Sequence, residues 1–189
     1  PKNAPASASS SKSDTRQKNR VLQGRCKPSF CALSCPCLDM IAGVARTRLE
    51  PMQLSDMPQA THEFLRNTRL GTLVHAGEPW PNAVPVWYEW TGSEIVMFSR
   101  GDRPKNTYLA GDPRASFLVA AETAEPVYWV VIEGTATIDG DAAGLVERLC
   151  DKYCDLDTES GRELKADIMA ARHEAVRIRI SADRVRHFG

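Results

Sequence analysis

Hydrophobic residues gather in short runs along the middle and the end of the chain, and turn-forming residues separate these runs. The runs are rich in β-branched and aromatic residues, and Gly, Pro, Asp or Ser follows most of them, which is the usual signal of a strand. The predicted strands are Leu70–Ala76, Ala83–Trp90, Glu94–Ser99, Arg114–Ala120, Tyr128–Ile138, Glu174–Ile180 and Arg184–Phe188. Their close spacing predicts a meander or a small barrel rather than parallel βαβ units.

Apolar residues spaced three or four positions apart predict helices between some of these strands. The helical segments are Ser55–Asn67, Asn106–Ala110, Ala142–Tyr153 and Glu159–Ala171. The side chains expected to face the core from the three longer segments are Ala60, Phe64, Leu65, Leu145, Val146, Leu149, Tyr153, Leu164, Ile168 and Met169. The chain is therefore expected to be a mostly β domain with flanking helices and about six to seven antiparallel strands.

The alternation of side chains along the strands predicts the core. Its expected members on the first four strands are Leu70, Leu73, Val84, Val86, Ile95, Met97, Phe117 and Val119. Tyr88 and Trp90 should face one way and Trp87 the other. Aromatic residues on both faces of one strand indicate a dimer interface or a flat ligand on one face, and packing under the helices is an equal alternative.

Two later strands carry their own signals. Tyr128–Ile138 is almost continuously apolar, which predicts burial on both faces, and Gly134 within it predicts a bulge or a close backbone approach. Glu174–Ile180 alternates strictly, so Arg177 and Arg179 are expected on a solvated face.

Charge is divided unevenly along the chain and limits the classes of partner. Residues 1–50 hold nine Lys or Arg against three Asp or Glu, whereas residues 51–189 hold fifteen against twenty-one. The first segment is also rich in Ser and lacks apolar periodicity, so we expect a disordered basic tail over 1–50 and one domain over 51–189. An over-extended reading frame, with Met40 or Met52 as the natural start, is the alternative. The acidic domain lacks the excess of positive charge that is typical of a nucleic-acid-binding protein.

The cysteines and the hydropathy of the chain give few further candidates for a metal site or a membrane-spanning segment. Cys26, Cys31, Cys35 and Cys37 follow a C-x4-C-x3-C-x-C spacing that only partly matches a zinc site, and Cys150 and Cys154 are expected to be buried free thiols. No run reaches the roughly 18 apolar residues of a membrane span. No secretory signal is recognised, so a cytoplasmic location is expected.

The loop Ser99–Lys105, SRGDRPK, is the clearest candidate site. It leaves a strand and enters a short helix, and it brings a hydroxyl, three cations and a helix N-terminus together. Helix N-termini and charge-assisted bonds from Lys and Arg suit an anion such as a phosphate. A solvated hairpin loop that is basic by chance is the alternative.

The order of these pieces resembles a known family. The strands RLGTL and NAVPVWY, a third strand ending in Ser99, Lys105 six residues on, and a D-P-R turn into SFLV are similar to the pyridoxamine 5′-phosphate oxidase-like flavoproteins, within about 55–188. The resemblance is strongest to the branch that holds FMN proteins and deazaflavin (coenzyme F-420) dependent reductases. It implies an FMN-binding split barrel, a homodimer and a redox activity on a small organic molecule.

Carried over to matching positions, the resemblance implies a set of cofactor-binding residues. Ser99, Arg103 and Lys105 would hold the cofactor phosphate. Val84, Pro85, Val86 and Trp87 would lie along the ring system, and Trp129 and Val130 would reach the site across a dimer interface.

The sequence departs from the family's pattern at two places, and these departures bear on the choice of cofactor and on the activity. Deazaflavin-using relatives often carry another basic residue just after the lysine, where this chain has Thr107 and Tyr108, so FMN is favoured over F-420. The C-terminal Val185–Gly189 does not match the Arg-rich substrate segment of true pyridoxamine phosphate oxidases. The alternatives are a non-catalytic binder of flavin, haem or another tetrapyrrole, and an interaction module whose site has decayed. No metal, nucleic acid or membrane partner is expected.

Overall fold

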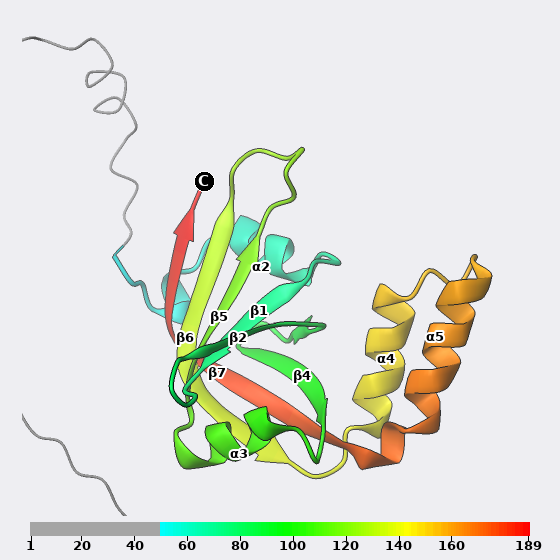
Figure 1. The fold of residues 1–189 in the computed structure, drawn as a ribbon. Helices are drawn as coiled ribbons and strands as arrows, with labels where there is room; N and C mark the ends of the chain where they lie inside the picture. The colour runs from blue at the N-terminus through cyan, green and yellow to red at the C-terminus, as the bar shows by residue number, and fades with distance from the viewer. Residues whose placement is uncertain (1–49) are drawn as a thin grey trace, which may run out of the picture. The chain divides into compact units, whose positions relative to one another are not determined.

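The computed structural model describes residues 50–189, and Figure 1 shows their arrangement. The expectations for the tail, its four cysteines and its alternative starts therefore lie outside the described residues. In this described part of the chain, seven strands form one antiparallel sheet in the order β2-β1-β5-β6-β7-β4-β3. The strands are β1 (Gly71–His75), β2 (Asn82–Val86), β3 (Glu89–Trp90), β4 (Glu94–Arg100), β5 (Arg114–Ala120), β6 (Trp129–Asp139) and β7 (Ala175–Phe188).

Within residues 50–189, four helices flank the curled sheet. They are α2 (Gln59–Arg66), α3 (Pro104–Gly111), α4 (Ala143–Tyr153) and α5 (Glu159–Ala170), together with the short 3-10 turns η1 (Leu54–Asp56) and η2 (Arg172–Glu174). Figure 1 shows α4 and α5 side by side as a hairpin, and α3 at the end of the sheet where β4 finishes. The expected split β-barrel with flanking helices is confirmed. None of the helices among residues 50–189 is long and apolar enough to cross a membrane.

The sheet curls because its two edges are joined by only two residues. β2 and β3 are the edge strands of the sheet, yet β2 ends at Val86 and β3 begins at Glu89. Three residue steps span at most about 11 Å, so the two edges must come close at this point. The run Ala83–Trp90, expected as one strand, is therefore two strands in different parts of the sheet, and the linker Trp87–Tyr88 crosses between them.

The core lies inside the curl of the sheet. Its largest fully buried side chains include Leu73, Tyr88, Ile95, Met97, Phe117, Ile132, Ile178 and Ile180. Tyr88 and Trp90 face this core while Trp87 is half-buried on the other side, as the alternation predicts. Leu70 is 58% exposed because it precedes β1, and Val84 and Val86 are half-buried because β2 is an edge strand.

The predicted helices are present, but some of their ends and some of their core-facing residues differ from expectation. Pro58 disfavours helical backbone at Met57, so Leu54–Asp56 forms a separate turn and α2 begins at Gln59. Leu65 faces the core as expected, but Thr61 is buried in place of Ala60, which is exposed. Leu164 is 46% exposed, because α5 packs mainly on α4 through the half-buried Ile168 and Met169.

The long strands β6 and β7 differ from expectation in three ways. The two expected C-terminal strands form the single strand β7, which pairs along the whole of β6 on one edge and, through its first half, with β4 on the other. The register of β6 and β7 shifts between Glu133 and Gly134, which confirms the bulge. The outer face of β6 is only partly covered within one chain, and Arg177 and Arg179 are half-buried and pair with Asp139 at 3.3 and 3.1 Å.

Candidate functional site

A pocket of about 420 Å³ lies between β2 and the N-terminus of α3. Its walls are His75, Asn82, Ala83, Val84, Arg103, Pro104 and Lys105. Arg103 is the N-cap of α3, Pro104 opens the helix, and no side chain caps the helix end. The first N–H groups of a helix lack intrahelical partners and carry partial positive charge. The pocket therefore combines two cations with the positive end of a helix, which suits an anion.

Arg103 and Lys105 are free for a ligand within this part of the chain. Among residues 50–189 neither side chain forms an ion pair or a hydrogen bond, although most of the other arginines pair with carboxylates. Lys105 is half-buried, and its pKa is lowered from 10.5, first by burial and then by repulsion from Arg103. An anion between the two cations would offset both effects, because its negative charge stabilises the charged form of Lys105.

Asn106 shapes the loop that carries these cations. Its side chain is buried, and its amide group donates to the carbonyl oxygens of Arg100 at 2.6 Å and Gly101 at 3.1 Å. The Gly101 N–H in turn donates to the carbonyl oxygen of Glu174 at 2.9 Å. The loop is therefore held from two sides. No sequence signal marks Asn106, because its partners are backbone carbonyl groups, which every residue type carries.

Ser99 does not line this pocket, although the sequence groups it with Arg103 and Lys105. The residue is 3% exposed, and its hydroxyl donates to the carbonyl oxygen of Arg100 at 3.1 Å. It lies on β4 before the loop turns toward α3. In this arrangement the Ser99 hydroxyl stabilises the backbone of the loop and does not contact the pocket.

His75 is a further residue of the first pocket, and no motif in the sequence marks it. Its Nδ1 donates to the carbonyl oxygen of Ala76 at 2.6 Å, since a carbonyl can only accept. Its Nε2 is buried and has no hydrogen-bond partner within residues 50–189. No local pattern marked this residue, because its burial follows from α3 packing near β1.

A second pocket, of about 400 Å³, follows β2 toward its C-terminal end. Its walls are Leu70, Pro85, Val86, Trp87, Phe98 and Ile168, and none of them is charged. Val84 lines the first pocket and Pro85 the second, so the edge strand β2 runs along both. Pro85 has no N–H, and such a residue is tolerated on an edge strand where the ladder does not need its donor. The two pockets together could take a molecule with an anionic end and an apolar, flat body.

Trp129 and Val130 line neither pocket of their own chain. Val130 is fully buried in the core, and Trp129 lies on the outer face of β6, where its ring is stacked on Phe188 with centroids 6.2 Å apart. The structure thus brings Val84, Pro85, Val86, Trp87, Arg103 and Lys105 to the two pockets and leaves Trp129, Val130 and Ser99 apart from them.

A third hollow, of about 540 Å³, lies around the β6–β7 bulge and is a weaker candidate for an anion. It contains Asp112, Glu133 and Asp183. Asp112 pairs with Arg114 at 2.6 Å, and Glu133 pairs with two arginines. Its positive charges are therefore already neutralised. Among residues 50–189 no group of three or more His, Cys, Asp or Glu side chains could hold a metal ion.

Comparison with known proteins agrees with this fold. The solved structure of a conserved hypothetical protein, Rv2991 from Mycobacterium tuberculosis, is similar with 27% identity, over 72% of this chain and 89% of that one, with a TM-score of 0.55. An F420 reductase is similar at 18% identity, over 68% and 98% of the two chains, with a TM-score of 0.56. A putative pyridoxamine 5′-phosphate oxidase from Listeria innocua is similar at 16% identity, over 68% and 95%, with a TM-score of 0.50.

No curated protein matches the chain. The family model described as pyridoxamine 5′-phosphate oxidase matches residues 57–187, which is more than half of the chain and includes both pockets. The chain therefore belongs to the pyridoxamine 5′-phosphate oxidase-like family.

Proposed function

We propose that this protein binds FMN, or alternatively the deazaflavin coenzyme F-420, and acts as an oxidoreductase on a small organic substrate. The observation that carries the proposal is the pair of cations at the start of α3. Arg103 and Lys105 face a pocket beside an edge strand, and neither has a carboxylate partner among residues 50–189. A phosphate is the anion that such a helix terminus commonly takes.

The residues of the two pockets fit such a cofactor. Arg103 and Lys105 would hold the phosphate, because the half-buried ammonium of Lys105 lacks the negative charge that would stabilise it. Val84, Pro85, Val86 and Trp87 would lie along the ring, since β2 runs from the first pocket into the apolar second one. Ser99 would contribute through the loop, because its hydroxyl already bonds to Arg100.

Both pockets contain few groups that could act in catalysis. Among the described residues, neither contains a carboxylate, a thiol or a hydroxyl. A bound flavin or deazaflavin supplies hydride transfer itself, and the protein binds and orients the ring. The role of these side chains is therefore to hold the phosphate, to position the ring and to exclude water.

FMN is the favoured cofactor. Thr107 and Tyr108 stand where a further basic residue would be expected for the longer anionic deazaflavin, and the first turn of α3 offers only Lys105 as a cationic side chain. The likeness to an F420 reductase, at 18% identity, keeps the deazaflavin as the alternative.

A homodimer would complete the site. Trp129 stacks on Phe188 on the outer face of the sheet, and Leu118 on the same sheet is 37% exposed. An apolar, aromatic patch of this kind suits a protein interface. A second copy would cover the patch and bring its Trp129, and the backbone of its Val130, toward the cofactor pocket.

The decisive experiment is an absorbance spectrum of the protein purified from a host that makes FMN but no deazaflavin, followed by titration of the apoprotein with each cofactor. Bound flavin supports the FMN assignment, and binding of the deazaflavin alone supports the alternative. Binding of either cofactor without turnover of added quinones or enones indicates a carrier. Binding of neither would refute the proposal.

A further inference from the structure

The linker Trp87–Tyr88 is held in place from outside the sheet, by the C-terminal end of α4. Tyr88 is fully buried, with its ring against Phe117 at a centroid distance of 5.1 Å. Trp87 points the opposite way and forms a wall of the apolar second pocket. Because neighbouring residues of this linker face opposite sides, the position of its backbone decides where the Trp87 ring lies.

The hydroxyl of Tyr153, the last residue of α4, is bound to that backbone. It lies 2.8 Å from the carbonyl oxygen of Arg69 and 3.1 Å from that of Tyr88, and it accepts from the Tyr88 N–H at 3.3 Å. One hydroxyl has a single proton, so it donates to one carbonyl at a time, and Arg69 offers the shorter bond. The carbonyl of Tyr88 has a second donor, since Nζ of Lys152 lies 3.3 Å away.

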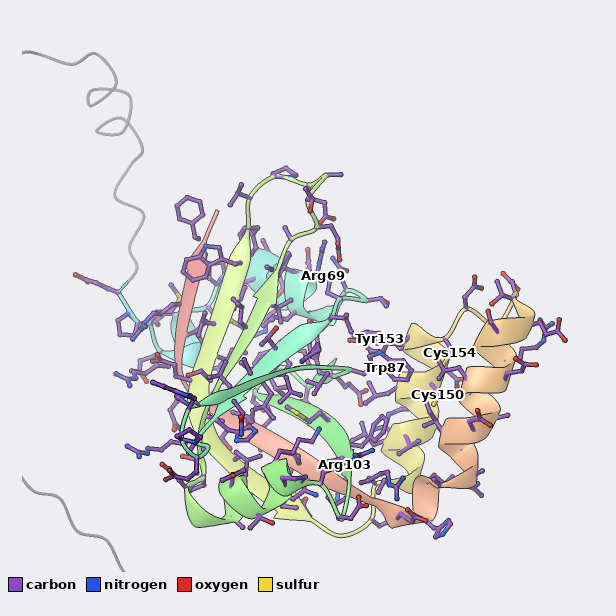
Figure 2. All side chains as sticks on the ribbon, in the orientation of Figure 1. Arg69, Trp87, Arg103, Cys150, Tyr153 and Cys154 are labelled. Carbon is purple, nitrogen blue, oxygen red and sulfur yellow. The ribbon has the colours of Figure 1, made fainter. Side chains whose placement is uncertain are left out.

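The ring of Tyr153 also holds Trp87 directly. The two rings are parallel within 4° and their centroids are 5.2 Å apart. Figure 2 shows Trp87 and Tyr153 facing each other across the space between the sheet and α4. The helix itself is anchored by Leu145, Val146 and Leu149, all at most 3% exposed. Tyr153 therefore joins a rigid helix to both the backbone and the side chain of the linker.

The protonation state of Tyr153 supports a lasting attachment. Burial raises the pKa of Tyr153 to about 12, so its hydroxyl keeps its proton near neutral pH and remains able to donate.

We infer that Tyr153 is a positioning residue, which fixes Trp87 as a wall for a flat ring in the second pocket. The inference rests on the proposed cofactor function, because that function places the ring along β2. It extends the site to α4, which contributes no residue to the cofactor-binding set expected from the sequence. Tyr153 acts through Trp87 and Tyr88 and does not need to touch the ligand.

The test is Tyr153→Phe, which keeps the stacked ring and removes only the hydroxyl. Two quantities are measured, the hydrogen-exchange rate of the Tyr88 amide without cofactor and the dissociation constant for FMN. Both should rise roughly tenfold, the change expected when a hydrogen bond of ordinary strength is lost. The flavin absorbance bands of the bound cofactor should also shift, because the wall against the ring is less well fixed.

Thr61→Val is the matched control. Thr61 is fully buried and its hydroxyl bonds to that of Tyr128 at 2.8 Å, but it lines neither pocket. It should lower the stability of the fold and leave the FMN dissociation constant unchanged. An unchanged Tyr88 exchange rate in Tyr153→Phe, or an FMN affinity lost equally in Thr61→Val, would overturn the inference. A wild-type protein that binds neither cofactor would refute the proposed function, while the exchange rate would still decide whether Tyr153 holds the linker.

Discussion

The backbone of Ser181 lies so close to Gly134 that no other residue fits at that position. A β-carbon on Gly134 would stand 1.7 Å from the carbonyl oxygen of Ser181. This contact occurs at the bulge where the register of β6 and β7 shifts, between Glu133 and Gly134. Beyond this bulge, the first half of β7 pairs with β6 on one edge and with β4 on the other.

Gly134→Ala should therefore destabilise the protein by about 1–3 kcal/mol or more, because the backbone of two central strands must move apart. The free energy of unfolding in urea measures the effect. Gly111→Ala is the control, since within residues 50–189 nothing outside the neighbouring residues and the backbone of its own helix lies within 4 Å of its β-carbon position. Equal stability of the two variants would show that the bulge is not tightly constrained.

Lys105→Ala should weaken FMN binding by about 1.5–3 kcal/mol, the value of a hydrogen bond to a charged group. The physical reason is the loss of a half-buried cation with no competing carboxylate. Isothermal titration of the apoprotein gives the affinity. Arg66→Ala removes an exposed cation that lines neither pocket and should leave the affinity unchanged. If Lys105→Ala also leaves it unchanged, the phosphate does not lie at α3.

The affinity for FMN should fall as pH rises into the alkaline range. The folded pKa of Lys105 lies below 10.5, so the ammonium is lost earlier than in a free lysine, and only the charged form attracts a phosphate. The phosphate itself is already a dianion above its second pKa of about 6. Titrations from pH 7 to about 10 should show this loss in the wild type and much less of it in Lys105→Arg, because arginine keeps its charge there. Parallel pH profiles of the two proteins would contradict the assignment.

Asn106→Asp should lower both stability and FMN affinity. The buried amide that donates to the carbonyls of Arg100 and Gly101 would become a carboxylate, which repels them and leaves both unpaired. The expected cost is about 1–3 kcal/mol for the lost buried hydrogen bonds. Thermal unfolding and FMN titration are the measurements. Asn67→Asp, at the exposed C-cap of α2, is the control. It should leave the FMN affinity unchanged and lower the stability by less than about 1 kcal/mol, the usual effect of a carboxylate at an exposed helix C-terminus.

Trp129→Ala should shift a homodimer toward the monomer and weaken FMN binding in the same variant. The ring forms the aromatic patch on the outer face of the sheet by stacking on Phe188. Light scattering after gel filtration gives the mass. Trp80→Ala removes a side chain that is 76% exposed on the β1–β2 turn and should leave the mass unchanged. A Trp129→Ala protein with unaltered mass and affinity would exclude this face as the shared interface.

The sequence determined the local structure of this protein. Strands such as Arg114–Ala120, the helix ending at Tyr153 and the glycine bulge at Gly134 were predicted because alternation, helical spacing and glycine act over a few residues. The cations of the loop before α3 were also visible, since a charge cluster next to a helix start is a local pattern. The family followed from the order of these pieces.

Only the tertiary structure decided which local features meet. It divided Ala83–Trp90 between two edges of the sheet and buried Ser99 with its hydroxyl on the Arg100 carbonyl, outside the wall of the pocket that Arg103 and Lys105 line. It also brought Tyr153 to Tyr88, sixty-five residues away in the chain. The physical reason is that these contacts join backbone groups and rings from distant segments. Their geometry depends on how the sheet curls, and no periodicity in the sequence encodes that closure.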